Sequence, residues 1–258
     1  MNSMNSLLNV NNLSKTYYSK KGETLAIEDV SFSINKNDFI GIVGPSGCGK
    51  SSILNIISML DKDHKGDIIL NKNVSIGYMF QEPVLFSWLT VLDNALLGLK
   101  ISKKLNNDTK KYTISLLKKY GLYEFKDKYP NSLSGGMKQR VALIRTLALN
   151  PDILLLDEPF SALDYQTRLK VSEDVYNIIK AEEKTVLIVT HDISEAISMC
   201  TKIIVLSKRP AYIKKIINID LETNNGPIEN RKSSLFPKYY EEIWKEIDEW
   251  CQKNKKII

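Results

Sequence analysis

The sequence lacks the features that mark several whole classes of protein. No apolar run approaches the roughly 18 residues that a membrane-spanning helix needs, and the longest apolar runs, such as Ile153–Leu156, have the length of a buried strand. Residues 1–12 have no basic flank followed by an apolar block, as a secretion signal would. The cysteines Cys48, Cys200 and Cys251 have neither zinc-like spacing nor a disulfide framework. We therefore expect a soluble, intracellular protein.

The charge balance has no concentrated block of either sign. The 258 residues suffice for one sizeable domain with a hydrophobic core and a small appendage. The net charge of +6 comes from lysines that are scattered rather than massed. We interpret them as solvated surface residues and expect no nucleic-acid partner.

The periodicity predicts an α/β domain interrupted by helices. Short apolar runs between residues 7 and 37 are typical of antiparallel strands, and Phe39–Val43 is a buried strand that enters a glycine-rich turn. Residues 91–149 follow a helical period. After Pro151 strands alternate with helices, and Ile203–Ser207 is the last strand that we expect. This alternation implies a parallel sheet covered on both faces.

The C-terminal tail has a different pattern. Residues 224–227 form a predicted linker. Beyond it an apolar stripe recurs at helical steps of four and three: Phe236, Tyr240, Ile243, Ile247 and Trp250. The sequence therefore predicts a domain over residues 1–223, followed by a linker and amphipathic helix over 224–258.

The strongest motif lies directly after the buried strand. Residues 44–51 match G-x-x-x-x-G-K-[ST], with a strand before and a helix after. The glycines let backbone N–H groups curl around phosphate oxygens, Lys50 would reach the β- and γ-phosphates, and Ser51 would bind Mg²⁺. The predicted nucleotide-binding residues here are Gly44, Pro45, Ser46, Gly47, Cys48, Gly49, Lys50, Ser51 and Ser52. A chance glycine turn would not need the flanking strand and helix.

Two carboxylates end a second buried strand. Asp157 and Glu158 follow Ile153–Leu156, and acids at the carboxyl end of such a strand can meet a cation and a water. Asp157 would support Mg²⁺, directly or through water, and Glu158 would act as general base on the attacking water. Acidic turns are common at strand ends, so this pair indicates a catalytic site only because the chain also has a phosphate loop.

The segment Leu133–Arg140 indicates which class of phosphate-loop protein the chain resembles. Its Ser134, Gly135 and Gly136 could open an ordinary helix, with Ser134 at an N-cap-like position. After a phosphate loop, however, the segment resembles the signature motif of ABC-type ATPases. In that family this motif contacts the γ-phosphate of the ATP that the partner subunit holds.

Other landmarks of that family follow in order. Tyr17 resembles the aromatic residue that stacks on adenine, with Tyr18 as the adjacent alternative, although either could be an ordinary strand residue. Gln81 resembles the glutamine that binds Mg²⁺ and senses the transmembrane partner. Residues 161–164, ending at Asp164, resemble the loop that crosses the dimer interface, and His191 resembles the switch histidine that contacts the γ-phosphate.

The resemblance spans residues 8–210 and implies a P-loop NTPase of the ABC type. Its cassette has a parallel-sheet core, an N-terminal antiparallel β subdomain and an inserted helical subdomain at about residues 82–150. The resemblance also implies ATP and Mg²⁺ as cofactors and an ATP-dependent, head-to-tail dimer of two copies. The dimer would dock on permease subunits at the cytoplasmic face of the membrane, as a peripheral protein served indirectly by an extracellular solute-binding protein.

A closer likeness concerns the transported solute. Residues 81–83, the run that begins at Trp88 and residues 157–164 resemble importers of the nitrate, sulfonate and taurine group, whose relatives also carry pyrimidine vitamin precursors. This resemblance implies an ATP hydrolase coupled to import. Two alternatives belong to other classes. A soluble P-loop kinase has no use for the signature segment or His191, and a non-transport ABC protein usually has two cassettes or a long coiled coil.

Overall fold

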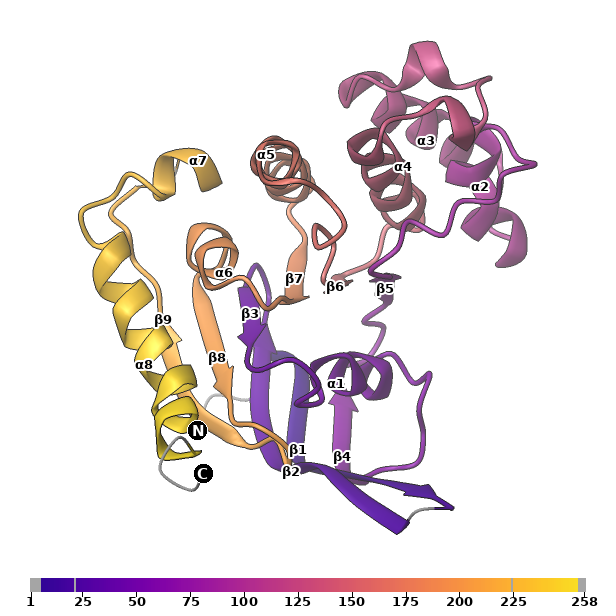
Figure 1. Cartoon of the computed structure of the whole chain (residues 1–258). Helices are drawn as coiled ribbons and strands as arrows, with labels where there is room; N and C mark the ends of the chain where they lie inside the picture. Colours follow the sequence, from indigo (N-terminus) through magenta and orange to yellow (C-terminus); the bar gives the residue numbers. More distant parts are fainter. Residues whose placement is uncertain (1–5, 21, 224, 255–258) are drawn as a thin grey trace. The chain divides into compact units, whose positions relative to one another are not determined.

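The computed structural model describes residues 6–20, 22–223 and 225–254, with side chains described up to residue 247. It divides into two compact units, Met1–Val74 with Thr185–Ile258, and Ser75–Lys184 (Figure 1). Within the described ranges, no helix combines the length and apolar character needed to span a bilayer.

The first unit contains the antiparallel sheet that the N-terminal pattern predicts. Strand β1 (Ser6–Ser19) lies between β2 (Gly22–Asn35) and β4 (Lys65–Leu70), and both pairings are antiparallel. Along β1, Leu8 and Val10 are buried and Asn9 between them is partly exposed. This alternation is expected of a sheet that buries one face.

The same unit contains a mostly parallel sheet. Strand β3 (Phe39–Val43) pairs in parallel with β7 (Thr185–Val189) on one side and with β8 (Lys202–Leu206) on the other. Every residue of β3 and β7 is buried, as expected for central strands of a parallel sheet. The helices that follow these strands are α1 (Lys50–Ile57), after β3, and α6 (Ile193–Met199), after β7.

The prediction that the 203–207 strand is the last one was wrong. Strand β9 (Ile213–Asn218) pairs antiparallel with β8. Its apolar residues do not alternate cleanly, because Lys214 and Lys215 are adjacent and Ile216 is exposed while Ile217 is buried. Lysines suit a sheet edge because they discourage pairing with other chains. The pattern was therefore that of an edge strand, which period-two reasoning does not detect.

The second unit combines a strand pair with a group of helices. Strands β5 (Ile76–Met79) and β6 (Ile153–Asp157) pair in parallel. Helices α2, α3 and α4 gather into one cluster in Figure 1, where the helical period was predicted. The helices of this unit are α2 (Val91–Ile101), α3 (Asn107–Lys119), α4 (Gly135–Leu147) and α5 (Tyr165–Ala181), with 3₁₀ turns at Tyr123–Phe125 and Pro130–Ser132. Gly121, with φ of 70°, follows the end of α3, where a left-handed glycine commonly ends a helix.

The tail forms a short helix α7 (Pro227–Asn230) and a long helix α8 (Phe236–Asn254). Ile243 is fully buried, and Phe236, Tyr240 and Ile247 are partly buried, so the predicted stripe is confirmed as far as residue 247. The side chain of Trp250 lies outside the described residues. Ion pairs hold α8 against β9: Lys215–Glu242 at 2.9 Å and Lys214–Glu246 at 3.3 Å. The proposed division at residues 223 and 224 stays a prediction.

Candidate active site

The phosphate loop joins β3 to α1 and has the backbone that its glycines permit. Gly47 and Gly49 have φ of 73° and 125°, in the left-handed region that other residues adopt at a cost. The buried side chain of Lys50 turns back over the loop, and its Nζ donates to the carbonyl oxygens of Gly44 at 2.9 Å and Pro45 at 3.2 Å. The loop is thus already curled around its own lysine.

The start of α1 fits a bound phosphate. Its N-cap residue is Gly49, and no described side chain caps it. The N-terminal end of a helix favours an anion, because its dipole and its first N–H groups point toward that end. Ser46 and Ser51 are exposed and Ser52 is half-buried, so hydroxyl groups also lie at the surface of this loop.

Cys48 contributes to the loop through its backbone rather than its thiol. Its side chain is 1% exposed, and a Cβ added at Gly44 would lie 3.2 Å from the Cys48 Sγ and 3.1 Å from the Leu206 Cβ. The thiol therefore packs against the interior behind the loop. Burial raises the pKa of this thiol, and the nearby charge of Lys50 opposes that shift only in part.

We expect Cys48 to react with N-ethylmaleimide far more slowly in the native protein than in urea. The thiolate is the nucleophile, and with a raised pKa it forms only at a pH above the usual range of a thiol. Mass spectrometry of the Cys48 peptide over time and pH measures this, and a Cys48→Ser variant should bind ATP as the wild type does. Rapid native labelling that ATP prevents would show instead that the thiol faces the nucleotide.

Of the two adjacent tyrosines, Tyr17 lies beside the phosphate-loop helix. Its hydroxyl donates to the Ser52 Oγ at 2.8 Å, and the Lys15 Nζ lies 4.9 Å from its ring centroid. Tyr17 is 40% exposed and Tyr18 is 69% exposed, on opposite faces of β1 because successive strand side chains alternate. The geometry favours Tyr17 as the residue that contacts a nucleotide.

His191 lies at the sheet edge where the phosphate loop begins. Ile42 of β3 pairs with Val189 of β7, and the Thr190 backbone N–H donates to the Ile42 oxygen at 3.2 Å. The carboxyl ends of these parallel strands therefore meet at one edge. His191 is exposed there, directly before Asp192, whose side chain caps α6.

In the second unit, the two carboxylates differ in environment. Asp157 is buried and accepts a hydrogen bond from the Tyr78 hydroxyl at 3.0 Å. Burial raises the pKa of Tyr78, and the negative charge of Asp157 raises it further, so this phenol remains a donor. Glu158 is only partly buried and has φ of 43°, an uncommon value for a residue with a side chain. Such backbone strain clusters at functional positions.

Gln81 is linked to Glu158 through one serine. The Gln81 Nε2 donates to the Ser161 Oγ at 3.0 Å, and that hydroxyl donates to the Glu158 backbone oxygen at 3.0 Å. The structure thus brings Gln81 to a segment, Glu158 to Ser161, that lies far from it in the sequence. Gln81 is exposed.

The signature segment is placed by close packing of its glycines. Ser134 caps α4 by accepting from the Met137 N–H at 3.3 Å and is exposed. A Cβ at Gly135 would lie 3.1 Å from the Leu163 Cδ2, and one at Gly136 only 2.6 Å from the Val171 Cγ2. A side chain at Gly136 would therefore displace Val171 of α5, whereas one at Gly135 would make a tight contact with the end of the Leu163 side chain.

Asp164 ends that loop and caps α5. Its carboxylate accepts from the Thr167 N–H at 3.1 Å, and hydrogen bonds from Thr167 lower the pKa of Asp164. Asp164 is exposed, so it can meet another molecule as well as cap its helix.

Sequence reasoning missed Tyr78 and Arg209. The Arg209 Nη2 donates to the Gly47 oxygen at 2.6 Å, so the turn between β8 and β9 supports the phosphate loop from outside. The Tyr78 hydroxyl holds Asp157. Tyr78 lies in β5, and its bond to Asp157 depends on the pairing of β5 with β6. Arg209 has no sequence signal.

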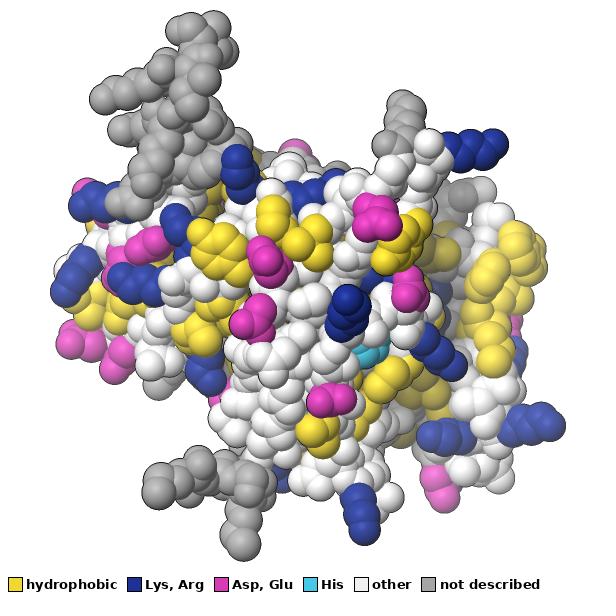
Figure 2. Space-filling model, turned by 90° about the horizontal axis from the view of Figure 1, so that it is seen from below, with side chains coloured by type: hydrophobic (Ala, Val, Ile, Leu, Met, Phe, Trp, Pro, Cys, Tyr) yellow, Lys and Arg dark blue, Asp and Glu magenta, His cyan; other side chains and the backbone are white. Residues whose placement is uncertain are grey.

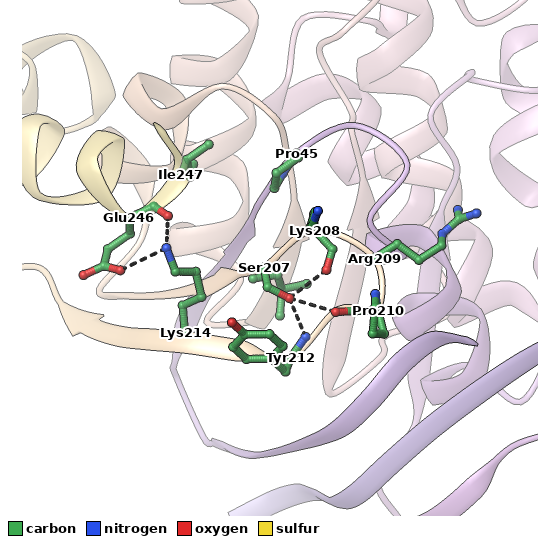
Figure 3. Close-up of a pocket in the computed structure, with 10 residues that line it drawn as sticks. Pro45, Ser207, Lys208, Arg209, Pro210, Tyr212, Lys214, Glu246 and Ile247 are labelled. Carbon is green, nitrogen blue, oxygen red and sulfur yellow. Dashed lines mark hydrogen bonds and ion pairs between the residues drawn. The ribbon is translucent and has the colours of Figure 1, made fainter. Parts of the chain in front are cut away.

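A pocket of about 230 Å³ lies beside the phosphate loop in the first unit (Figure 3). Its wall includes Pro45 of the loop, Tyr212 of the β8–β9 turn and Ile247 of α8. Dashed contacts in Figure 3 show Lys214 joined to Glu246 and Ser207 bonded within the turn. The tail helix therefore borders the loop that carries Lys50.

The comparisons with known proteins all indicate the same family. The family described as ABC transporter matches residues 27–161. The uncharacterized ABC transporter ATP-binding protein YtlC of Bacillus subtilis is 43% identical over 250 residues, 94% of this chain and 96% of that protein. The aliphatic sulfonates import ATP-binding protein SsuB of Bacillus anthracis is 38% identical over 235 residues, 89% of this chain and 91% of that protein.

A solved structure is similar over most of the chain. It is a dimeric post-hydrolysis state of the ATP-binding cassette MJ0796 bound to ADP and Pi. It has a TM-score of 0.69 and 32% sequence identity, and the match covers 83% of this chain and 99% of that one.

Proposed function

Since the chain belongs to the family of ABC transporter ATP-binding proteins, we propose that it energises an importer of a small solute. Members of this family are ATPases coupled to transport, and the predicted cassette fold and the likeness to the sulfonate importer group are confirmed. The solute that we propose is nitrate-, sulfonate- or taurine-like, or like a pyrimidine vitamin precursor. SsuB, an import protein for aliphatic sulfonates by name, supports the first of these.

The observation that carries the proposal is the preformed phosphate loop. Lys50 is buried over two loop carbonyls, and the glycines beside it have the positive φ that a phosphate cradle needs. ATP would take the place of those carbonyls as the partner of the Lys50 ammonium. Tyr17 would stack on the adenine, and His191 would contact the γ-phosphate.

The hydrolytic roles would fall to the residues that resemble those of the family. Mg²⁺, which Ser51, Gln81 and Asp157 would hold, supplies neutralisation of charge on the phosphate oxygens. Glu158 would accept a proton from the attacking water. The Tyr78 hydroxyl donates a hydrogen bond to the Asp157 carboxylate and so orients it.

The partners follow from the family. Two copies would close head to tail on ATP, with Ser134 and Asp164 of one copy facing the nucleotide of the other; the dimeric MJ0796 cassette supports this arrangement. The dimer would dock on a membrane permease at the cytoplasmic face, fed by an extracellular solute-binding protein. Hydrolysis would reopen the dimer, because ATP and ADP differ in affinity for the closed state.

A nucleic-acid function has less support. On the face shown in Figure 2, Lys and Arg side chains are interspersed with acidic and apolar ones. A nucleic-acid site would gather its cations along one face. A soluble kinase would not need the close packing of Gly135 and Gly136.

We expect the Glu158→Gln variant to form a stable dimer in ATP and a monomer in ADP. The amide cannot accept the proton from water, so ATP stays intact and the closed state persists. Light scattering after gel filtration should give twice the mass of 29.4 kDa in ATP alone. Glu124→Gln, an exposed carboxylate in the same unit, is the control and should behave as wild type. A monomer in saturating ATP would contradict the proposal.

A further inference from the structure

The segment that follows Gln81 has a strained backbone. Val84 has φ of 42°, and a β-branched residue with positive φ is a genuine outlier. The Val84 side chain is exposed, so apolar burial does not hold this conformation in place. Something else must stabilise it.

Two side chains of α4 hold this segment. The Arg145 guanidinium donates to the backbone oxygens of Val84 at 2.7 Å and Pro83 at 2.8 Å. The Gln139 Nε2 donates to the Gln81 oxygen at 3.4 Å. Side chains of α4 therefore donate hydrogen bonds to the backbone at both ends of the segment from Gln81 to Val84. The planar fork of arginine suits two neighbouring carbonyls in a way that lysine does not.

Gln139 shows that this arrangement is incompletely satisfied. It is 1% exposed, and among the described residues its Oε1 has no hydrogen-bond partner. A buried acceptor without a donor is costly. The side chain would gain a bond if the adjacent segment moved and presented a donor. The strained backbone of Val84 and the unpartnered Gln139 Oε1 thus lie at the same segment.

We propose that Gln139 and Arg145 are positioning residues. Together they form a clamp that fixes residues 81–84 and connects Gln81 to α4, the helix that begins in the signature segment. The clamp rests on the proposed function, in which Ser134 contacts the ATP held by the partner copy. Gln81 contributes to the ATP site of its own chain. Ser134 and the clamp lie on the same helix, so a displacement of Ser134 is transmitted to residues 81–84. From there it reaches Glu158 through the Gln81–Ser161 hydrogen bonds. The clamp thus couples the two ATP sites of a dimer.

Arg145→Lys tests the clamp while keeping the charge. Lysine cannot bond both carbonyls, so we expect kcat for ATP to fall roughly tenfold, as for the loss of one charge-assisted hydrogen bond, with KM unchanged. Amide hydrogen exchange over residues 80–88 should quicken by a similar factor. Gln139→Leu should also lower kcat, yet raise the melting temperature because it removes the unpartnered oxygen. A purely structural role predicts no fall in kcat where stability rises.

Rescue by glycine is the decisive measurement. Glycine adopts positive φ without strain, so Val84→Gly in the Arg145→Lys background should restore most of kcat. Val84→Ala removes the same exposed side chain but retains the strain, and should restore little. Equal behaviour of the two double variants, or wild-type kcat and exchange in Arg145→Lys, overturns the clamp. A wild-type protein that does not hydrolyse ATP would instead overturn the proposed function, while hydrogen exchange still decides the clamp.

Discussion

Replacing Lys50 by alanine is expected to weaken ATP binding by about two orders of magnitude and to abolish hydrolysis. The substitution removes the only described side-chain ammonium that lies over the loop carbonyls. A charge-assisted hydrogen bond contributes about 1.5 to 3 kcal/mol, so one or two bonds to phosphate correspond to roughly a hundredfold in Kd. Titration calorimetry with ATP measures the affinity, and phosphate release measures turnover.

The control for this experiment is another lysine of the same unit. Lys202 lies at the amino end of β8, away from the loop, and its Nζ is 3.5 Å from an Asp38 oxygen. Lys202→Ala should leave the affinity for ATP unchanged. Because Lys50→Ala also deprives two loop carbonyls of a donor, the melting temperature of both variants must be compared. Wild-type affinity in folded Lys50→Ala would show that the loop does not bind phosphate.

The phosphate loop could be predicted from sequence because its chemistry is local. Glycines at positions 47 and 49 and a lysine at 50 determine both the backbone and the cation of one turn, and the structure has them so. The chemistry of Ser134 and Asp164 is local too, because each side chain caps the helix that follows it. Tyr17 could be separated from Tyr18 only with the structure, because both faces of β1 were open alternatives.

What the sequence did not reveal depends on contacts between distant residues. The Tyr78–Asp157 bond requires β5 to lie beside β6, which no local pattern specifies. Arg209 reaches Gly47 across 162 positions of sequence. Strand β9 was missed because its lysines suit a strand at the edge of a sheet and interrupt the apolar alternation of a core strand. The strain at Glu158 and Val84 is likewise visible only in backbone angles.

Two variants that trap no ATP alone are expected to trap it when they are mixed. Suppose that one chain carries Lys50→Ala and its partner carries Ser134→Arg. If each ATP lies between Lys50 of one chain and Ser134 of the other, one site collects both lesions and the second keeps both native residues. With Glu158→Gln added to both chains, the tagged and co-purified mixed dimer should trap one ATP, whereas each variant alone traps none.

The reverse arrangement of the same lesions gives the opposite result. If one chain carries both substitutions and pairs with a chain that has neither, each site receives one lesion and no ATP should be trapped. A site contained within one chain predicts the reverse order, because the unaltered partner would keep its own ATP. Ser134→Arg also removes a helix cap, at a cost of about 1 kcal/mol, so Asn106→Arg at the exposed cap of α3 is the matched control. Since one intact site can be too few for turnover, bound ATP rather than hydrolysis is counted, and equal trapping in both arrangements would refute the shared site.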